Sequence, residues 1–384
     1  MNKFFKPILT LIMLMSVINA WADDEQKNPS ELKFYINAGH GGWGHGDRPM
    51  PTKPFPSRQI TIQDYSHGYN EPEPSSPTSK TVFLPDTCGF FESNTNLWKC
   101  EGLKETLIKM GANPSNIRMS RDENGPYPQT SYTQYDNNIS KYTPIIAGEA
   151  EEFAPDLFIA IHSDAGVTSL GASSVYLDNH VLFLYRGHDA EGGDMSAGSR
   201  DIAYALWEKH FMDEIDYMSP GVSRTNTNIR GDFDFYGSGI DITNNIYSGI
   251  PYEGYLGVLK HGYPGVLVEG FSHQYEPETH RALNRDFCRQ EGVRLARGIC
   301  DYFNMTPETT GYIMGTVKDQ SQNPPFTYYN SGEDSYLPIN GAMVKLYKGN
   351  NLINIYPTDE FYNGIFCFEN LEPGNDYYIN VQGF

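Results

Sequence analysis

Three apolar segments of this sequence each lead into a side chain that can bind a metal or transfer a proton. In chain order, these side chains are His40, His162 and Glu269. A fourth, Glu92, stands just before a helical pattern, where a carboxylate faces the positive end of the helix dipole. Two histidines and a carboxylate form the ligand set of a catalytic zinc site, which leaves a fourth position open for water. The residue types therefore indicate a zinc site with a further carboxylate near it.

The segments that must position these residues are short, apolar and bounded by Gly or Pro, as is typical of buried strands in a mostly parallel sheet. Strands are predicted at residues 34–36, 157–161 and 266–268, and helices at residues 94–110, 198–212 and 279–303. Strands that alternate with helices indicate an α/β fold, a mostly parallel sheet flanked by helices. Because ligands bind outside the carboxyl ends of such strands, we expect the four side chains to converge on one crevice.

Each of these residues also has a plain structural interpretation. A single histidine is more often a hydrogen-bonded structural residue than a metal ligand, and Glu92 alone could be a helix N-terminal carboxylate. Glu269 is harder to explain in this way, because a carboxylate at the end of a buried strand must find a partner or shift its pKa. The shared position of these residues at strand ends favours a common site.

The glycines around His40 imitate a dinucleotide-binding motif. Gly39, Gly41 and Gly44 have the G-x-G-x-x-G spacing, but that motif must lead into a helix. Four prolines between residues 49 and 56 forbid a helix here. We expect these glycines to remove side-chain bulk beside His40 instead, so that metal and substrate can approach the backbone.

Residues 1–22 have the pattern of a signal peptide. Lys3 and Lys6 precede an apolar run at residues 8–18, and the small-residue site Ala20-Trp21-Ala22 follows it. The run is too short to span a membrane, which takes about 20 apolar residues. We therefore expect an exported protein, periplasmic or secreted, with no membrane span and with cleavage after Ala22.

The charge of the chain excludes several classes of partner. Its 384 residues contain 48 acidic and 28 basic side chains, a formal charge of −20, and removal of Lys3 and Lys6 with the leader would make the mature chain more acidic still. Such a chain is a poor binder of nucleic acids and anionic membranes. Export also makes ATP and NAD improbable cofactors.

Two long segments interrupt the alternation of strands and helices. Residues 44–85 are rich in proline, serine and glycine, and residues 219–249 are rich in asparagine and glycine. Loops this long are uncommon unless they shape a site, although surface insertion is the alternative. His45 and His67 lie in the first segment and could contact substrate or be solvent-exposed.

In order and spacing, these motifs resemble the zinc-dependent N-acetylmuramoyl-L-alanine amidases (amidase type 3), which cut bacterial peptidoglycan. The resemblance covers residues 32–303. It consists of Ile36-Asn37-Ala38-Gly39-His40-Gly41-Gly42, Glu92 with Asn94 and Leu97, Ser120-Arg121-Asp122, Ile159-Ala160-Ile161-His162-Ser163-Asp164 and Val266-Leu267-Val268-Glu269-Gly270-Phe271. By resemblance, His40, Glu92 and His162 would bind Zn²⁺ and Glu269 would be the catalytic carboxylate.

The sequence departs from the family pattern at a few positions beside the proposed ligands. Ala38 replaces the usual proline, and Ser163-Asp164 replaces Ala-Asn after the second histidine. Arg121 stands where the family has an arginine, for which a structural salt bridge with Asp122 and substrate binding are both open.

The resemblance implies a reaction and a substrate. The expected substrate is peptidoglycan or a muropeptide, and the expected reaction is hydrolysis of the amide between N-acetylmuramic acid and L-alanine by zinc-activated water. Two alternatives stay open, a zinc peptidase that acts on peptides and a non-catalytic wall-binding protein. Retention of all four proposed residues argues against the second alternative.

Composition changes near residue 305, which predicts two domains, a catalytic domain at residues 31–305 and a β-sandwich at residues 311–384. Alternating strand patterns appear at residues 312–317, 342–347, 364–368 and 377–381. This region resembles the carboxypeptidase regulatory-like domains through Gly315-Thr316-Val317, residues 338–346 and residues 366–377. Domains of that kind carry no catalytic set, and two alternatives stay open for the sandwich: a missing final strand or an open edge.

The cysteine count is five, too few for a disulfide scaffold. Cys288 and Cys300 share one predicted helix and lie about 18 Å apart along it, too far to pair. Cys88 and Cys100 bracket Glu92, and either a disulfide or two reduced thiols would fit these positions.

Overall fold

The fold is described from a computed structural model of the chain. The structure describes residues 28–41, 57–64, 78–85, 90, 92–124, 143–164, 179, 181–209, 228–236, 240–241, 246–247, 250–251, 259, 262–273, 275–324 and 332–382. The predicted signal peptide and cleavage site, His45, His67 and Cys88 lie outside these residues. None of the described helices is both long and apolar enough to cross a membrane.

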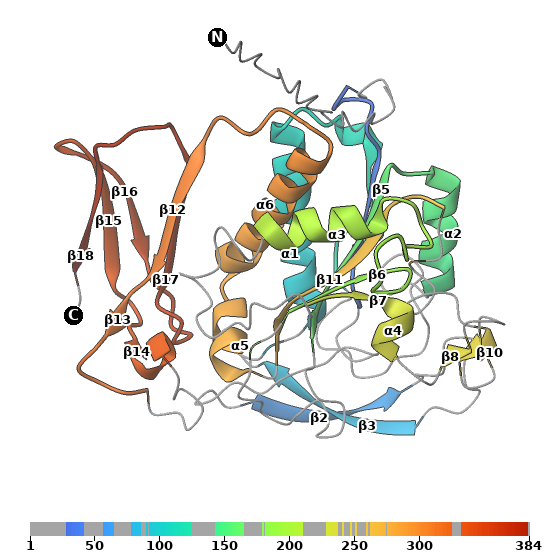
Figure 1. Cartoon of the computed structure of the whole chain (residues 1–384). Helices are drawn as coiled ribbons and strands as arrows, with labels where there is room; N and C mark the ends of the chain where they lie inside the picture. The colour runs from blue at the N-terminus through green and yellow to red at the C-terminus, as the bar shows by residue number, and fades with distance from the viewer. Residues whose placement is uncertain are drawn as a thin grey trace, which may run out of the picture.

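A six-stranded sheet forms the centre of the molecule (Figure 1). Its strand order is β4 (Ile117–Met119), β1 (Phe34–Ala38), β5 (Leu157–Asp164), β11 (Gly265–Ser272), β6 (Leu182–Tyr185) and β7 (Ile229–Gly231). Neighbouring strands run parallel except β11 and β6, which are antiparallel. The sheet is thus mostly parallel, as predicted, and the three predicted apolar segments are its central strands β1, β5 and β11.

Helices cover both faces of this sheet, which is why its central strands contain continuous apolar runs. One face packs against α1 (Glu92–Lys109), α3 (Ser199–Trp207) and α6 (Arg285–Tyr302), and the other against α2 (Thr143–Phe153). Successive side chains of a strand point to opposite faces. In β5, Ile159 and Ile161 join the core under α1 and α6, whereas Phe158 and Ala160 join the core under α2.

Several predicted boundaries were wrong. β5 continues through His162 to Asp164 and β11 continues through Glu269 to Ser272, so both side chains lie inside strands rather than after them. The helix predicted at residues 279–303 is two helices, α5 (Glu276–Ala282) and α6, because the side chain of Asn284 caps the start of α6 by accepting a hydrogen bond from the backbone of Phe287. Glu92 is the first residue of α1.

The two long segments contain regular structure in their described parts. The first includes an antiparallel hairpin of β2 (Ser57–Asp64) and β3 (Thr78–Pro85). The second includes β7 and α4 (Asp232–Tyr236), and its remainder contributes to a small sheet of β8 (Ile240–Asp241), β9 (Ile246–Tyr247) and β10 (Ile250–Pro251). Both segments therefore contain regular secondary structure that was not predicted, and the choice between shaping a site and surface insertion stays open.

The region after α6 consists of short antiparallel strands. β12 (Gly311–Thr316) pairs with β17 (Ile365–Leu371), β13 (Lys318–Asp319) with β14 (Leu337–Pro338), and β15 (Met343–Lys348) lies between β16 (Asn351–Pro357) and β18 (Tyr377–Gln382). Side chains from the β12–β17 pair and from the three-stranded sheet share one apolar core. The four strand patterns predicted here correspond to β12, β15, β17 and β18, and β13, β14 and β16 were missed.

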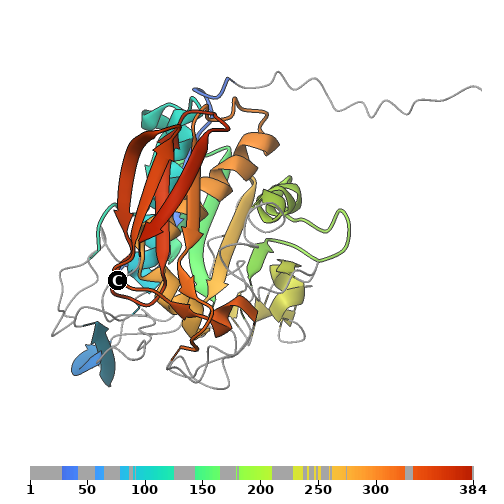
Figure 2. The same cartoon turned by 90° about the vertical axis from the view of Figure 1, so that its left-hand side faces the viewer.

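These C-terminal strands lie against the helices α5 and α6 (Figure 2). Ile365 and Met314 pack with Phe287 in a shared apolar cluster. Asp334 lies in the one-turn helix Gly332–Ser335. It accepts a hydrogen bond from Arg281, which lies in α5, and another from Tyr275, which directly precedes α5. The contact therefore combines an apolar cluster with a buried ion pair.

Candidate metal centre

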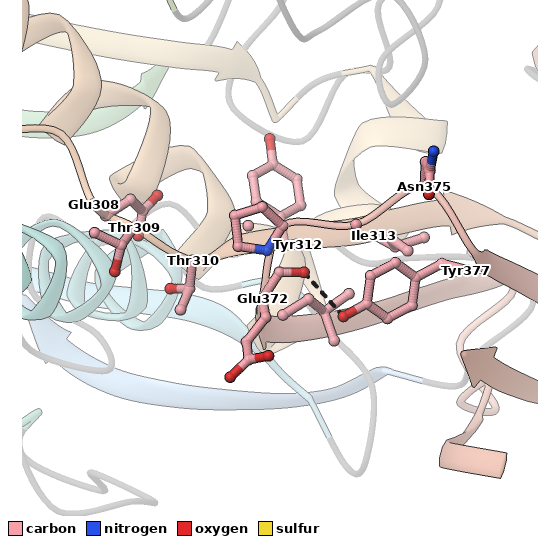
Figure 3. A pocket seen from close by; sticks show the side chains of 12 residues that line it. Glu308, Thr309, Thr310, Tyr312, Ile313, Glu372, Asn375 and Tyr377 are labelled. Atoms are coloured by element: carbon pink, nitrogen blue, oxygen red, sulfur yellow. Dashed lines mark hydrogen bonds between the residues drawn. The ribbon is translucent and has the colours of Figure 1, made fainter. Parts of the chain in front are cut away.

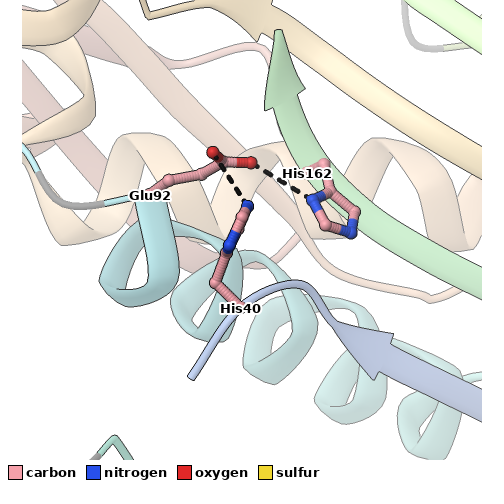
Figure 4. Close-up of side chains that lie close together, drawn as sticks. All are labelled: His40, Glu92 and His162. Carbon is pink, nitrogen blue, oxygen red and sulfur yellow. Dashed lines mark hydrogen bonds and ion pairs between the residues drawn. The ribbon is translucent and has the colours of Figure 1, made fainter. Parts of the chain in front are cut away.

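Three side chains that are far apart in the sequence meet at the carboxyl end of the sheet (Figure 4). The carboxylate of Glu92 lies between the two histidines, with His40 Nε2 3.1 Å from Oε2 and His162 Nδ1 3.2 Å from Oε1. The two imidazole rings meet edge to face, with centroids 5.2 Å apart. The structure thus brings together the three residues that the sequence predicted as metal ligands.

His40 follows β1 in a turn that holds the backbone close to β5. The amide of Gly39 donates to the carbonyl of Ile161, 3.0 Å away. A Cβ atom at Gly39 would overlap the imidazole ring of His162, so only glycine fits this position. His40 itself has φ 58°, in the left-handed region that non-glycine residues rarely adopt.

Arg121 stabilises this turn by hydrogen bonds to its backbone carbonyls. Its Nε donates to the carbonyls of Ala38 and His40, both 3.0 Å away, and its Nη2 donates to the carbonyl of Gly39 at 2.9 Å. The same Nη2 reaches the carbonyl of Ser93 in α1 at 2.7 Å. Arg121 is only 4% exposed. Of the two roles left open for it, these contacts with the backbone of the turn and of α1 favour the structural one.

Glu92 is held by α1 and by β5. The Ser163 amide donates to Glu92 Oε1 at 3.0 Å, and Asn96 Nδ2 lies 3.4 Å from the same oxygen. The glutamate side chain is 2% exposed, whereas His40 and His162 are 19% and 14% exposed. Burial alone would raise the pKa of Glu92, but the two histidines lower it well below its usual value. Glu92 is therefore a carboxylate, the form that binds metal.

Glu269 lies on the strand next to His162. The two residues are register partners in the parallel pair of β11 and β5. Side-chain alternation places both on the same face of the sheet. Glu269 is 6% exposed, and β11 changes register between Glu269 and Ser272. The fourth predicted residue is therefore adjacent to the cluster but is not one of its three donors.

The three donor groups fit a zinc ion by type and by spacing. Their ligand atoms all lie within 4.8 Å of one another. Zinc binds imidazole nitrogen and carboxylate oxygen at about 2.0–2.2 Å, so three donors this close can share one ion. The partial exposure of both histidines leaves one side of the cluster open to solvent.

A group of side chains that was not predicted from the sequence supports the Glu92 carboxylate. Ser163 Oγ lies 3.0 Å from Nδ1 of the buried His273, and the His273 ring stacks on Phe90. The His273 amide also donates to the carbonyl of Asp164 at 2.9 Å. Ser163 departs from the family pattern, and this contact gives that departure a structural role.

A buried ion pair behind His162 was also missed. Lys99 Nζ lies 3.0 Å from Glu291 Oε1, 3.0 Å from the carbonyl of His162 and over the ring of Phe271. Burial raises the pKa of Glu291 above its usual value, and Lys99 opposes this shift only in part. A signal was available, because Glu92, Asn96 and Lys99 follow the i, i+4, i+7 spacing of one helix face.

Comparison with known proteins gives structural similarities only. No family model matches the chain, and no curated protein matches it. The N-acetylmuramyl-L-alanine amidase of Mycobacterium smegmatis matches with 14% identity and a TM-score of 0.43 over 72% of this chain and 99% of that chain. The N-acetylmuramoyl-L-alanine amidase of Nostoc punctiforme matches with 14% identity and a TM-score of 0.38 over 71% and 97%. For Cwp6 from Clostridium difficile, the match has 16% identity and a TM-score of 0.38 over 70% of this chain but only 29% of that chain.

Proposed function

We propose that this chain is a zinc-dependent N-acetylmuramoyl-L-alanine amidase that hydrolyses the bond between N-acetylmuramic acid and the L-alanine of the stem peptide. The observation that carries the proposal is the cluster of His40, Glu92 and His162 beside Glu269 at the carboxyl end of the sheet. These are the four residues on which the resemblance to the amidases depends. The solved amidases add a similar architecture at low identity.

The reaction needs a polarised carbonyl, an attacking water and a proton for the departing amine. A bound zinc ion supplies Lewis-acid polarisation and lowers the pKa of a water to about 7. His40, Glu92 and His162 would hold the ion, with Ser163 and Lys99 keeping the carboxylate and the β5 backbone in place. Glu269 would accept the proton of the attacking water and deliver it to the amine.

The proposal includes an exported protein with two parts. Export follows from the signal-peptide pattern and agrees with a substrate outside the cytoplasm. Residues 31–305 would form the catalytic domain and residues 311–384 an accessory β-sandwich. Peptidoglycan or a muropeptide is the proposed partner.

The test is mass spectrometry of purified peptidoglycan after incubation with and without a metal chelator. We expect zinc-dependent release of stem peptides that begin with L-alanine. Cleavage within the glycan, or no product, would contradict the proposal. Hydrolysis of free stem peptides alone would indicate a zinc peptidase instead.

A substitution at Glu269 tests its assigned role. Glu269→Gln keeps the side-chain shape but removes the basic carboxylate, so we expect zinc binding to persist and the rate to fall about 100- to 10,000-fold. His40→Ala should lose both zinc and activity. Wild-type hydrolysis by Glu269→Gln would remove Glu269 from the mechanism.

A further inference from the structure

A hollow of about 440 Å³ lies between the segment that enters β12 and the turn between β17 and β18 (Figure 3). A smaller hollow of about 210 Å³ shares Glu308 and Thr310 with it. We call the two together the β12 groove. Its lining includes none of the proposed zinc ligands and not Glu269, so the groove is separate from the candidate metal centre.

Contacts with neighbouring groups fix the two tyrosine rings of the β12 groove, Tyr312 and Tyr377. The guanidinium of Arg297 lies 4.9 Å from the centroid of the Tyr312 ring, and its Nη2 donates to Glu308 at 2.9 Å. The hydroxyl of Tyr377 donates to the carbonyl of Glu372 at 2.9 Å. Side chains that are already fixed lose little conformational entropy when a ligand binds, so these contacts prepare the groove for a ligand.

The composition of the lining narrows the class of ligand. The charged side chains that line the larger hollow are the carboxylates Glu308, which is paired with Arg297, and Glu372. Lys209 and Arg297 line the smaller hollow, so the groove carries charges of both signs and favours neither a strong anion nor a strong cation. Its rings, Tyr312 and Tyr377, offer the apolar surface that Arg297 and Lys348, which lie over one face of each ring, leave free, and Thr310 and its neighbours offer hydroxyl and amide groups. A neutral saccharide matches this mixture, because its C–H faces pack on aromatic rings and its hydroxyls donate to carboxylate oxygens.

We propose that the β12 groove binds a neutral N-acetylated saccharide unit of the glycan, as a second substrate contact remote from the metal centre. The volume lies within the range of about 300–1,000 Å³ that is usual for small-ligand sites. The choice of this polymer rests on the proposed function. The net charge of −20 cannot supply affinity for an acidic wall polymer, whereas a contact with a neutral sugar can.

The distance between the two sites suits a polymer. Helix α1 begins at Glu92 in the metal centre, and Met110, directly after its last residue, lines the smaller hollow of the groove. Eighteen residues at about 1.5 Å each make this helix about 27 Å long. A glycan strand longer than this can contact both sites, and the second contact raises the local concentration of the scissile bond.

Calorimetric titration of the full chain with triacetylchitotriose, a neutral trimer of N-acetylglucosamine, tests this site. We expect saturable binding of the trimer to the wild type. In Gly311→Leu we expect the affinity for the trimer to fall by about tenfold or more. Gly311 lines the groove, and a Cβ atom there meets no atom within 4 Å, so the added side chain enters open space and the variant should fold.

Gly148→Leu is the matched control. Gly148 lies on α2, and its Cβ would also enter open space, so this variant should bind like the wild type. Tyr312→Phe keeps the ring and should retain most of the affinity, whereas Tyr312→Ala should not. Absence of trimer binding to the wild type, or equal binding by Gly311→Leu, would overturn the assignment. Binding of free stem peptide to the groove in place of the trimer would also overturn it.

The outcomes separate this inference from the proposed function. Gly311→Leu should hydrolyse a small soluble muropeptide at the wild-type rate and digest intact peptidoglycan more slowly. If the trimer binds but no amide is cleaved, only the proposed function fails. If amide cleavage occurs and Gly311→Leu behaves as the wild type on both substrates, only the groove assignment fails.

Discussion

His40, a proposed metal ligand that faces Glu92, has a strained backbone conformation. A left-handed φ at a non-glycine residue costs about 1–3 kcal/mol and persists only when its surroundings impose it. Here Arg121 binds the carbonyls of residues 38, 39 and 40, and Gly39 lets the turn approach the ring of His162. The precision of the cluster therefore depends on two residues that do not belong to it.

Gly39→Ala tests this dependence at the scale of one methyl group. The added Cβ overlaps the His162 ring, so the ring must move and zinc affinity should fall about 10- to 100-fold. Competition with a chromophoric chelator measures the affinity. Gly262→Ala is the control, because its Cβ meets no atom within 4 Å. Unchanged zinc affinity in Gly39→Ala would show that the turn does not position His162.

At the scale of secondary-structure elements, a polar network joins the C-terminal strands to the end of β11. Asp334 pairs with Arg281 at 2.8 Å, and Arg281 also pairs with Glu278. Asn179 donates to Glu278 at 3.2 Å and accepts from the Ser272 amide at 3.0 Å. Ser272 ends the strand that carries Glu269, so the C-terminal strands are linked through α5 to the part of the fold that holds the candidate metal centre.

Asp334→Asn should destabilise the protein by about 3 kcal/mol at pH 7, because it leaves Arg281 with one of its two buried carboxylate partners. Burial would raise the pKa of Asp334, but Arg281 and Lys318 lower it below its usual value. A lowered pKa in the folded state gives stability that is present above the unfolded value of about 3.9 and is lost as pH falls through the folded value.

Urea unfolding of wild type and Asp334→Asn at pH 7 and at pH 3 measures this effect. The difference between the two proteins should be largest at pH 7 and should begin to shrink below pH ~4, where Asp334 of the unfolded chain becomes protonated while the folded carboxylate still resists protonation. A difference that is the same at both pH values would show that the lost stability does not come from the carboxylate charge.

At the scale of the whole molecule, a charge of −20 opposes any acidic polymer. Salt screens this repulsion, since the Debye length falls from about 30 Å at 0.01 M to about 10 Å at 0.1 M. We expect binding to intact peptidoglycan to strengthen over this range, as measured by cosedimentation, while binding of neutral triacetylchitotriose stays constant. Weaker binding at higher salt would indicate a basic patch that dominates recognition.

The sequence by itself determined the central strands and the residues of the candidate site. Buried parallel strands must be apolar on both faces, so β1, β5 and β11 stand out as short apolar runs, and the side chains at their ends share one edge of the sheet. The order of His40, Glu92, His162 and Glu269 along the chain then follows from the order of these elements.

Only the tertiary structure decided which neighbours hold these residues. The contacts of Arg121 with the His40 turn, of Ser163 with His273 and of Lys99 with Glu291 join residues separated by 81, 110 and 192 positions along the chain. Local periodicity carries no information about such pairs, because it reports the face of an element and not the element it meets. The docking of the C-terminal strands on α5 and α6 depends on long-range contacts of the same kind.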